Sequence, residues 1–395
     1  MTTTSPQPAP GQPPPQAVAF GTRLKAFSAG ALVFALVLWL VPYRWCARDT
    51  RLWYLGDSAR QLELARGVAR QLDAQLTAQT FTTGDKQFDG EWLFGTYQMA
   101  GLGFAQIALQ HPELRAELIP QVRRCVEAIL RPDVRAFDRD CWGDDPIESL
   151  ETDHDHAAFL GYFNLVLGLH RRLEPDTPHV ALHDQITAAL VRRIERSPTL
   201  LIQTYPGEVY PVDNAAVIGS IGLHPGDHRD LIQRWTQRCR QRYVDRQTGL
   251  LVQCVTRDTG EPADEPRGSG TALGSYFLSF ADRGLSRELY TAARRQLAGR
   301  ILGFGVVREY PRGVTGRGDI DSGPILFGYG ISATGFLIAG SRIHHDAPEF
   351  ERLTSTAYLF GAPLRRRDRR EYVTGGPLGN AILLAMLTAR KEPID

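Results

Sequence analysis

Helical spacing of apolar residues dominates the chain from Leu52 onward, and two kinds of segment alternate. One kind carries Arg, Gln and Glu on one face, as in QLELARGVARQLDAQL; the other is rich in Gly, Ala, Ser and Phe, as in GPILFGYGISATGFLIAG. Apolar residues that recur every three or four positions predict amphipathic helices. This spacing predicts twelve helices, at 54–79, 91–110, 112–130, 154–173, 179–196, 213–223, 227–243, 269–282, 286–302, 322–341, 347–361 and 377–389.

The alternation itself predicts the architecture. A helix that is apolar nearly all round is buried, whereas a helix with one polar face lies at the surface. The buried segments begin at intervals of about 53 to 63 residues, which fits a repeat of one helical pair. We therefore predict an all-α fold, an (α/α)6 toroid of six helical hairpins over residues 50–392, with a short strand within Leu250–Thr256.

The N-terminal region has a different composition. Residues 1–20 are rich in proline, which predicts a disordered tail. Ala26–Tyr43 contains no charged residue, and a bilayer-spanning helix needs about 20 apolar residues. We predict a transmembrane anchor at 26–45, with the toroid on the extracytoplasmic, periplasmic side. The alternative is a cleaved signal peptide, but no small-residue cleavage site follows the apolar run.

In a toroid of this kind, the N-terminal ends of the inner helices meet at one mouth, so the segments that lead into them share a site. These segments carry Asp89, Glu91, Trp92, Asp153, His154, Asp155, His156, Tyr205, Tyr210, Asp213, Arg267, Asp319 and Asp321. Helix capping explains one acid in each segment, but it does not explain acid doublets. Two carboxyl groups in different environments have separate pKa values and serve as an acid and a base.

Tyr205–Leu223 is the central stretch, because Asp213 opens an apolar helix after a stiff Tyr-Pro turn. Asp213 is predicted to be either a helix cap or an acid–base group. His154 and His156 are two residues apart, which matches none of the common helical metal motifs. We therefore expect one histidine to carry protons, with no metal and no cofactor. The net charge of +1 and the lack of a phosphate-binding loop favour no nucleic-acid or nucleotide partner.

The middle of the chain resembles the linalool dehydratase/isomerase family. The resemblance runs over about residues 90–310 and rests on Cys141–Glu148 (CWGDDPIE), Gly161–Leu165 (GYFNL), Asp213-Asn214 and Asp245–Leu250 (DRQTGL). It implies a six-hairpin toroid that hydrates, dehydrates or isomerises a small terpene alcohol without a cofactor, outside the cytoplasm. The family's enzyme uses two cysteines and a histidine at the mouth, and these positions correspond to Thr204, Asp213 and Tyr162.

These departures remove the thiol pair, so linalool itself is not the expected substrate. Asp213 can replace one thiol, because an apolar pocket raises the pKa of a carboxyl group toward neutrality. The first hypothesis is a membrane-anchored lyase or isomerase that acts on a hydroxyl of a small, isoprenoid-like substrate. The alternatives are a glycoside hydrolase or carbohydrate lyase on the same toroid, and a non-catalytic anchored binding protein.

The sequence thus predicts two sets of site residues and leaves the oligomeric state open. Proton transfer is assigned to Asp213 and to Asp321 or Asp155 as its partner, with His156 as a further proton carrier. Tyr162 orients the substrate hydroxyl. The predicted substrate contacts are Trp92, Tyr205, Tyr210, Asn214, Arg267 and Asp319.

Overall fold

The computed structural model describes residue 2, residues 15–320 and residues 322–393, and it divides into two compact units. The first unit, Met1–Trp45, holds most of the helix α1 (Pro15–Ala47). Most of the predicted tail lies outside the described residues. A search of the described residues finds no helix with the length and apolarity needed to cross a bilayer. The anchor at 26–45, which lies within α1, stays a prediction.

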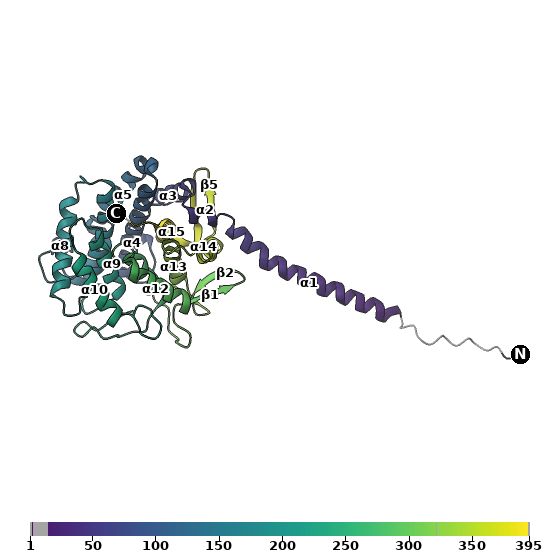
Figure 1. Ribbon diagram of the computed structural model, residues 1–395. Coiled ribbons are helices and arrows are strands. Elements are labelled where there is room, and N and C mark those ends of the chain that lie inside the picture. Colours follow the sequence, from purple (N-terminus) through teal and green to yellow (C-terminus); the bar gives the residue numbers. More distant parts are fainter. Residues whose placement is uncertain (1, 3–14, 321, 394–395) are drawn as a thin grey trace. The chain divides into compact units, whose positions relative to one another are not determined.

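The second unit, Cys46–Asp395, is mostly helical, as predicted (Figure 1). Six helices form a closed ring, because each contacts the next and the last contacts the first. These inner helices are α4 (Lys86–Gln110), α7 (Ala157–Leu173), α9 (Pro211–Leu223), α11 (Gly268–Leu278), α13 (Ile331–Ile343) and α15 (Gly376–Thr388).

Six further helices each contact a member of this ring. They are α3 (Ser58–Leu72), α5 (Arg115–Ile129), α8 (Val180–Arg196), α10 (Arg229–Arg242), α12 (Arg283–Gln296) and α14 (Ala347–Gly361). The twelve predicted helices correspond to these two sets. The inner helices hold much of the core, and their small residues allow close packing: the Cα of Gly103 on α4 lies so near α15 that an added Cβ would meet the Leu384 side chain at 2.5 Å.

The structure adds elements that the helical pattern did not predict. The helices α2 (Thr50–Leu55) and α6 (Pro132–Trp142) are additional, as are the 3-10 turns η1 (Ala78–Thr80), η2 (Pro112–Leu114) and η3 (Val373–Gly375). Three antiparallel hairpins pair β1 (Ala298–Ile301) with β2 (Phe304–Val307), β3 (Ile325–Leu326) with β4 (Tyr329–Gly330), and β5 (Pro363–Arg366) with β6 (Arg369–Tyr372).

Several predicted element bounds were wrong. The helix expected at 286–302 ends at Gln296, because β1 begins at Ala298, and the helix expected at 54–79 covers only Ser58–Leu72. The helix expected at 322–341 begins at Ile331, because β3 and β4 occupy the preceding residues and Gly328 turns the chain with a positive φ of 82°. The strand expected at 250–256 contributes only isolated bridges, among them Val255 with Val209. All five cysteines lie among the described residues, and they are free thiols.

The N-terminal ends of the inner helices meet, as the toroid requires. The Ala157 N–H donates to the Gln203 carbonyl, and the Gly268 N–H donates to the Glu309 carbonyl. Position 95, in the first half of α4, packs against Leu378 in the first turn of α15. We call the N-terminal ends of the inner helices, with the segments that lead into them, the mouth.

Candidate functional site

Asp213 lies in the first turn of α9, but it does not cap the helix. Tyr210 occupies the cap position, and no side chain accepts a capping hydrogen bond there. The two oxygens of Asp213 accept hydrogen bonds from two hydroxyl groups instead. Tyr162 donates to Oδ1 and Thr204 donates to Oδ2, each at 2.7 Å. Of the two roles predicted for Asp213, the geometry therefore excludes the cap.

The surroundings of Asp213 favour its neutral form. Burial raises the pKa of this carboxyl group, and the hydrogen bonds from Tyr162 and Thr204 offset only part of the effect. A buried carboxyl group whose pKa is raised is suited to giving up and recovering a proton near neutral pH. The three residues at the positions of the family's cysteines and histidine thus form one hydrogen-bonded cluster.

A second carboxylate lies near this cluster. The hydroxyl of the buried Tyr205 donates to Glu91 Oε2 at 2.8 Å, which connects the turn before α9 to the second turn of α4. Burial raises the pKa of Tyr205, and the negative charges of Glu91, Asp138 and Asp213 raise it further. Glu91 was expected at the mouth, but no role was assigned to it from the sequence.

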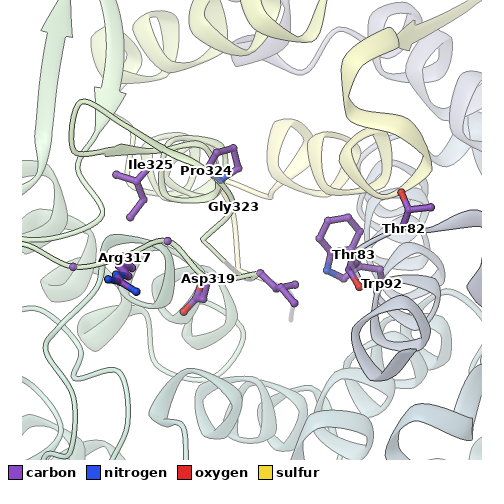
Figure 2. Close-up of a pocket in the computed structure, with 11 residues that line it drawn as sticks. Thr82, Thr83, Trp92, Arg317, Asp319, Gly323, Pro324 and Ile325 are labelled. Carbon is purple, nitrogen blue, oxygen red and sulfur yellow. The ribbon is translucent and has the colours of Figure 1, made fainter. Parts of the chain in front are cut away.

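Two predicted substrate contacts line or border the same cavity, which has a volume of about 670 Å³ (Figure 2). Trp92 on α4 lies on one side, and residues 316–320 and 323–325, among them Asp319, lie on the other. Thr82 and Thr83 complete the wall beside Trp92. Asp321, predicted to be a catalytic acid, lies outside the described residues.

Arg267 and Asp319 bind each other rather than standing open to solvent. The Arg267 guanidinium pairs with Asp319 and, at 2.7 Å, with Asp264, and it lies over the Tyr310 ring. Burial lowers the pKa of Arg267, but the two carboxylates outweigh burial and raise it overall. An anionic substrate group would have to displace these partners, so the predicted anion contact is occupied within the chain itself.

Asp155 and Asn214 hold the backbone. Asp155 Oδ2 accepts hydrogen bonds from the Gln203 backbone N–H at 2.9 Å and from its side-chain amide at 3.2 Å. Asn214 is fully buried, and its amide pairs with both backbone groups of Ile202 and with the Tyr210 carbonyl. The prediction that Asn214 contacts substrate was wrong, because its donors and its acceptor are used by the fold.

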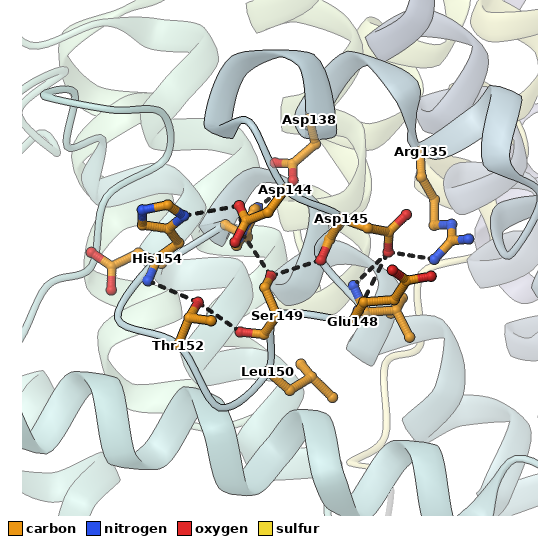
Figure 3. A network of polar contacts seen from close by, with 12 residues as sticks. Arg135, Asp138, Asp144, Asp145, Glu148, Ser149, Leu150, Thr152 and His154 are labelled. Atoms are coloured by element: carbon orange, nitrogen blue, oxygen red, sulfur yellow. Dashed lines mark hydrogen bonds and ion pairs between the residues drawn. The ribbon is translucent and has the colours of Figure 1, made fainter.

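Tyr210 and His156, two further residues predicted for the site, each contact a carboxyl group. Tyr210 is half-buried and donates from its hydroxyl to Glu208 at 2.9 Å. His156 is fully buried, and its Nδ1 lies 2.6 Å from Asp138 Oδ2. Burial raises the pKa of Asp138, and the hydrogen bond to His156 opposes that rise. His156 belongs to a second polar cluster, at the N-terminal end of α7, which also includes Asp144, Ser149 and His154 (Figure 3).

Glu309 was missed by the sequence analysis. This residue is fully buried just after β2, and Ser269 on α11 donates to its Oε1 through the hydroxyl group. Its Oε2 has no hydrogen-bond partner among the described residues. Burial raises the pKa of Glu309, with a further contribution from the negative charge of Asp319 that the Ser269 hydrogen bonds oppose.

The chain was compared with protein-family models and with curated proteins. No protein-family model matches the chain, and no curated protein matches it. The functional argument therefore rests on the residues of the mouth and on the chemistry that their arrangement permits.

Proposed function

We propose that residues 50–392 form an (α/α)6 toroidal enzyme of the linalool dehydratase/isomerase type, which uses acid–base chemistry without a cofactor on a hydroxyl of a small, isoprenoid-like substrate. One observation carries the proposal: the carboxyl group of the half-buried Asp213 is held between the hydroxyls of Tyr162 and Thr204. The family resemblance assigns its catalytic positions to these same three residues.

The proposed step is elimination of water. Protonated Asp213 gives its proton to the substrate hydroxyl, and the C–O bond breaks with both electrons going to oxygen, so that water leaves. A carboxylate removes a proton from the neighbouring carbon, and that C–H electron pair forms the new double bond. Tyr162 and Thr204 then stabilise the ionised Asp213, because hydrogen bonds to a charged group are worth about 1.5–3 kcal/mol each. Addition of water is the reverse.

Glu91 is the base that the described residues favour. Its carboxylate accepts the hydrogen bond from the Tyr205 phenol, and Tyr205 lies in the turn before α9, the helix that carries Asp213. Asp155, predicted as the partner of Asp213, is instead bonded to Gln203. Asp321 remains the second candidate from the sequence.

The cavity beside Trp92 favours an uncharged, partly apolar substrate, although Asp213 and Glu91 are not among the residues that line it. Its volume lies within the roughly 300–1,000 Å³ of small-molecule sites. Trp92, Ile320 and Pro324 supply apolar surface, and Thr82 and Thr83 supply hydroxyl groups. Because Asp264 and Asp319 already neutralise Arg267, this part of the mouth favours an alcohol or an alkene over a phosphorylated compound.

The test is an assay of the full chain on a panel of small allylic alcohols and the corresponding alkenes. Incubation in ¹⁸O-labelled water reports addition and loss of water by mass spectrometry. Asp213→Asn should lower the rate about 10²–10⁴-fold, since general acid–base groups contribute factors of that size. Asp153→Asn is the control, because Asp153 is exposed and pairs only with the surface residue Arg196 among the described residues. Full activity of Asp213→Asn would refute the assignment.

We propose further that residues 26–45 anchor the enzyme in a membrane, with the toroid on the extracytoplasmic side. The support is the uncharged run Ala26–Tyr43. The full chain should stay in the membrane fraction after an alkaline carbonate wash, and protease added outside the cell membrane should degrade the toroid. Deletion of residues 1–45 should release the protein. Recovery of the full chain in the soluble fraction would contradict the anchor.

A further inference from the structure

The polar cluster at the N-terminal end of α7 combines two histidines and one carboxylate at the spacing of metal ligands. His154 Nδ1 lies 2.8 Å from Asp144 Oδ1, and His156 Nε2 lies 3.3 Å from the same oxygen (Figure 3). The three ligand atoms lie within 4.8 Å of one another. Zinc–ligand bonds of about 2.0–2.1 Å place neighbouring ligands of a tetrahedral site ~3.3 Å apart.

A buried carboxylate supports His156 from behind. Asp138 is fully buried, and its Oδ2 lies 2.6 Å from His156 Nδ1, while His156 Nε2 lies on the side of Asp144. Metal-binding histidines almost always donate their other ring N–H to such a group, which fixes the ring and raises its basicity. His156 also adopts a left-handed backbone conformation, with φ of 49°, of the kind that clusters at functional sites.

The side-chain atoms that lie near His156 Nε2 in this cluster are oxygens. Ser149 Oγ lies 3.1 Å from Nε2, but its single hydrogen is donated to the Asp145 carbonyl at 2.7 Å. Nε2 therefore faces the oxygens of Ser149 and Asp144. Among the described residues, the ion-pair partners of Asp144 are only His154 and His156.

The surroundings fit a small site with access from solvent. The Trp142 ring packs against both histidine rings, with centroids 5.2 Å from His154 and 4.9 Å from His156. The side chain of His156 is fully buried, whereas those of Asp144 and His154 are 32% and 49% exposed. A cation can thus enter past the exposed ligands and reach the buried imidazole.

We propose that Asp144, His154 and His156 bind one divalent transition-metal ion of the zinc class, with Asp138 orienting His156. Imidazole nitrogens with one carboxylate oxygen suit Zn²⁺, and three protein ligands leave a fourth position for water. The site is independent of the proposed chemistry at Asp213, and it is tested by binding rather than by activity.

The experiment is a titration of the tag-free full chain, stripped with a chelator, with Zn²⁺ by calorimetry and with Co²⁺ by visible absorption. We expect one bound ion and the intense absorption of a four-coordinate cobalt site. His154→Gln and Asp144→Asn, at partly exposed positions, should weaken binding at least 100-fold, and His156→Gln should abolish it. Asp138→Asn should weaken binding about 10- to 100-fold, as for other supporting carboxylates.

A matched control lies elsewhere in the chain. His183, Asp184 and His224 bring ligand atoms equally close, but the Arg171 guanidinium already pairs with Asp184 and contacts His183. His224→Gln should therefore leave Zn²⁺ affinity and stoichiometry unchanged. Absence of binding at 1:1 with about 100 µM Zn²⁺, or loss of binding in His224→Gln but not in folded His154→Gln, would overturn the proposal.

Discussion

Three aspartates at the mouth show how neighbouring groups decide what a carboxyl group can do. Asp213 accepts from two hydroxyls in a buried place, and its pKa rises. Asp155 accepts from the backbone and side chain of Gln203 and fixes the turn before α9. Asp319 is partly desolvated, which raises its pKa, but the Ser322 N–H and Arg267 lower it overall. Only Asp213 combines burial with weak stabilisation of its charge.

The raised pKa of Asp213 predicts a pH-dependent cost in stability. Its folded pKa lies above the unfolded value of about 3.9, so its contribution is fully favourable below that pH and is lost as pH rises through the folded pKa. Asn cannot ionise. We therefore expect the melting temperature of Asp213→Asn, relative to the wild type, to increase from pH 4 to pH 7. A constant difference in thermal melts across this range would show that Asp213 has an ordinary pKa.

Site residues could be predicted where a pattern within one segment of the sequence indicated them. They could not be predicted where a site forms from two segments that are distant in the sequence. The family resemblance placed Thr204, Asp213 and Tyr162 at the mouth, and the structure brings the three together. Asp138 lies 18 residues from His156, and Glu309 lies 40 residues from Ser269, so neither pair forms a local motif. Hydrogen bonds that join different elements of the ring leave no periodic pattern in the sequence.

At the scale of elements, a polar side chain in the first or second turn of an inner helix repeatedly fastens the incoming chain. Asn214 accepts from the Ile202 N–H, and Asn380 accepts from the Tyr372 N–H; each also donates to the carbonyl four residues before it. Thr271 and Thr334 accept from Leu251 and Val307 in the same way.

Removal of either amide should destabilise the fold. Asn214→Ala and Asn380→Ala each leave buried backbone groups without partners, which costs about 2–3 kcal/mol. The free energy of unfolding in urea measures this loss. Gln237→Ala on the exposed face of α10 is the control and should stay within about 0.5 kcal/mol. A similarly small change in both asparagine variants would show that these hydrogen bonds do not fasten the ring.

At the scale of the whole second unit, closure of the ring determines where the mouth residues lie. The period of the buried segments predicted the order of the inner helices. A helix that is buried on all sides has apolar and small residues nearly all round, and this composition can be recognised in the sequence. The mouth segments were less predictable: the acids at 319 and 321 were expected at a helix start, but α13 begins only at Ile331. Turns and hairpins depend on contacts across the mouth, which a helical period does not describe.

Closure between α4 and α15 can be tested with two glycines on one helix. A Cβ at Gly103 would lie 2.5 Å from Leu384 Cγ and 3.1 Å from the Ala385 nitrogen, whereas a Cβ at Gly95 would meet Leu378 at an ordinary 3.6 Å. Gly103→Ala should lower the free energy of unfolding by about 1–3 kcal/mol. Gly95→Ala should raise it by up to about 1 kcal/mol through helix propensity. Equal effects in chemical denaturation would argue against the close approach of α4 and α15.

The most direct test of the central claim is a titration of the Asp213 carboxyl group by carbon-13 NMR. Comparison of the full chain labelled at aspartate carboxyl carbons with Asp213→Asn identifies the signal of this group. We expect the Asp213 carboxyl group to titrate with a midpoint clearly above the ordinary aspartate value of about 3.9. The reason is that burial outweighs the hydrogen bonds from Tyr162 and Thr204. A midpoint at or below the ordinary value would show a permanently ionised, structural carboxylate and would contradict an acid role for Asp213.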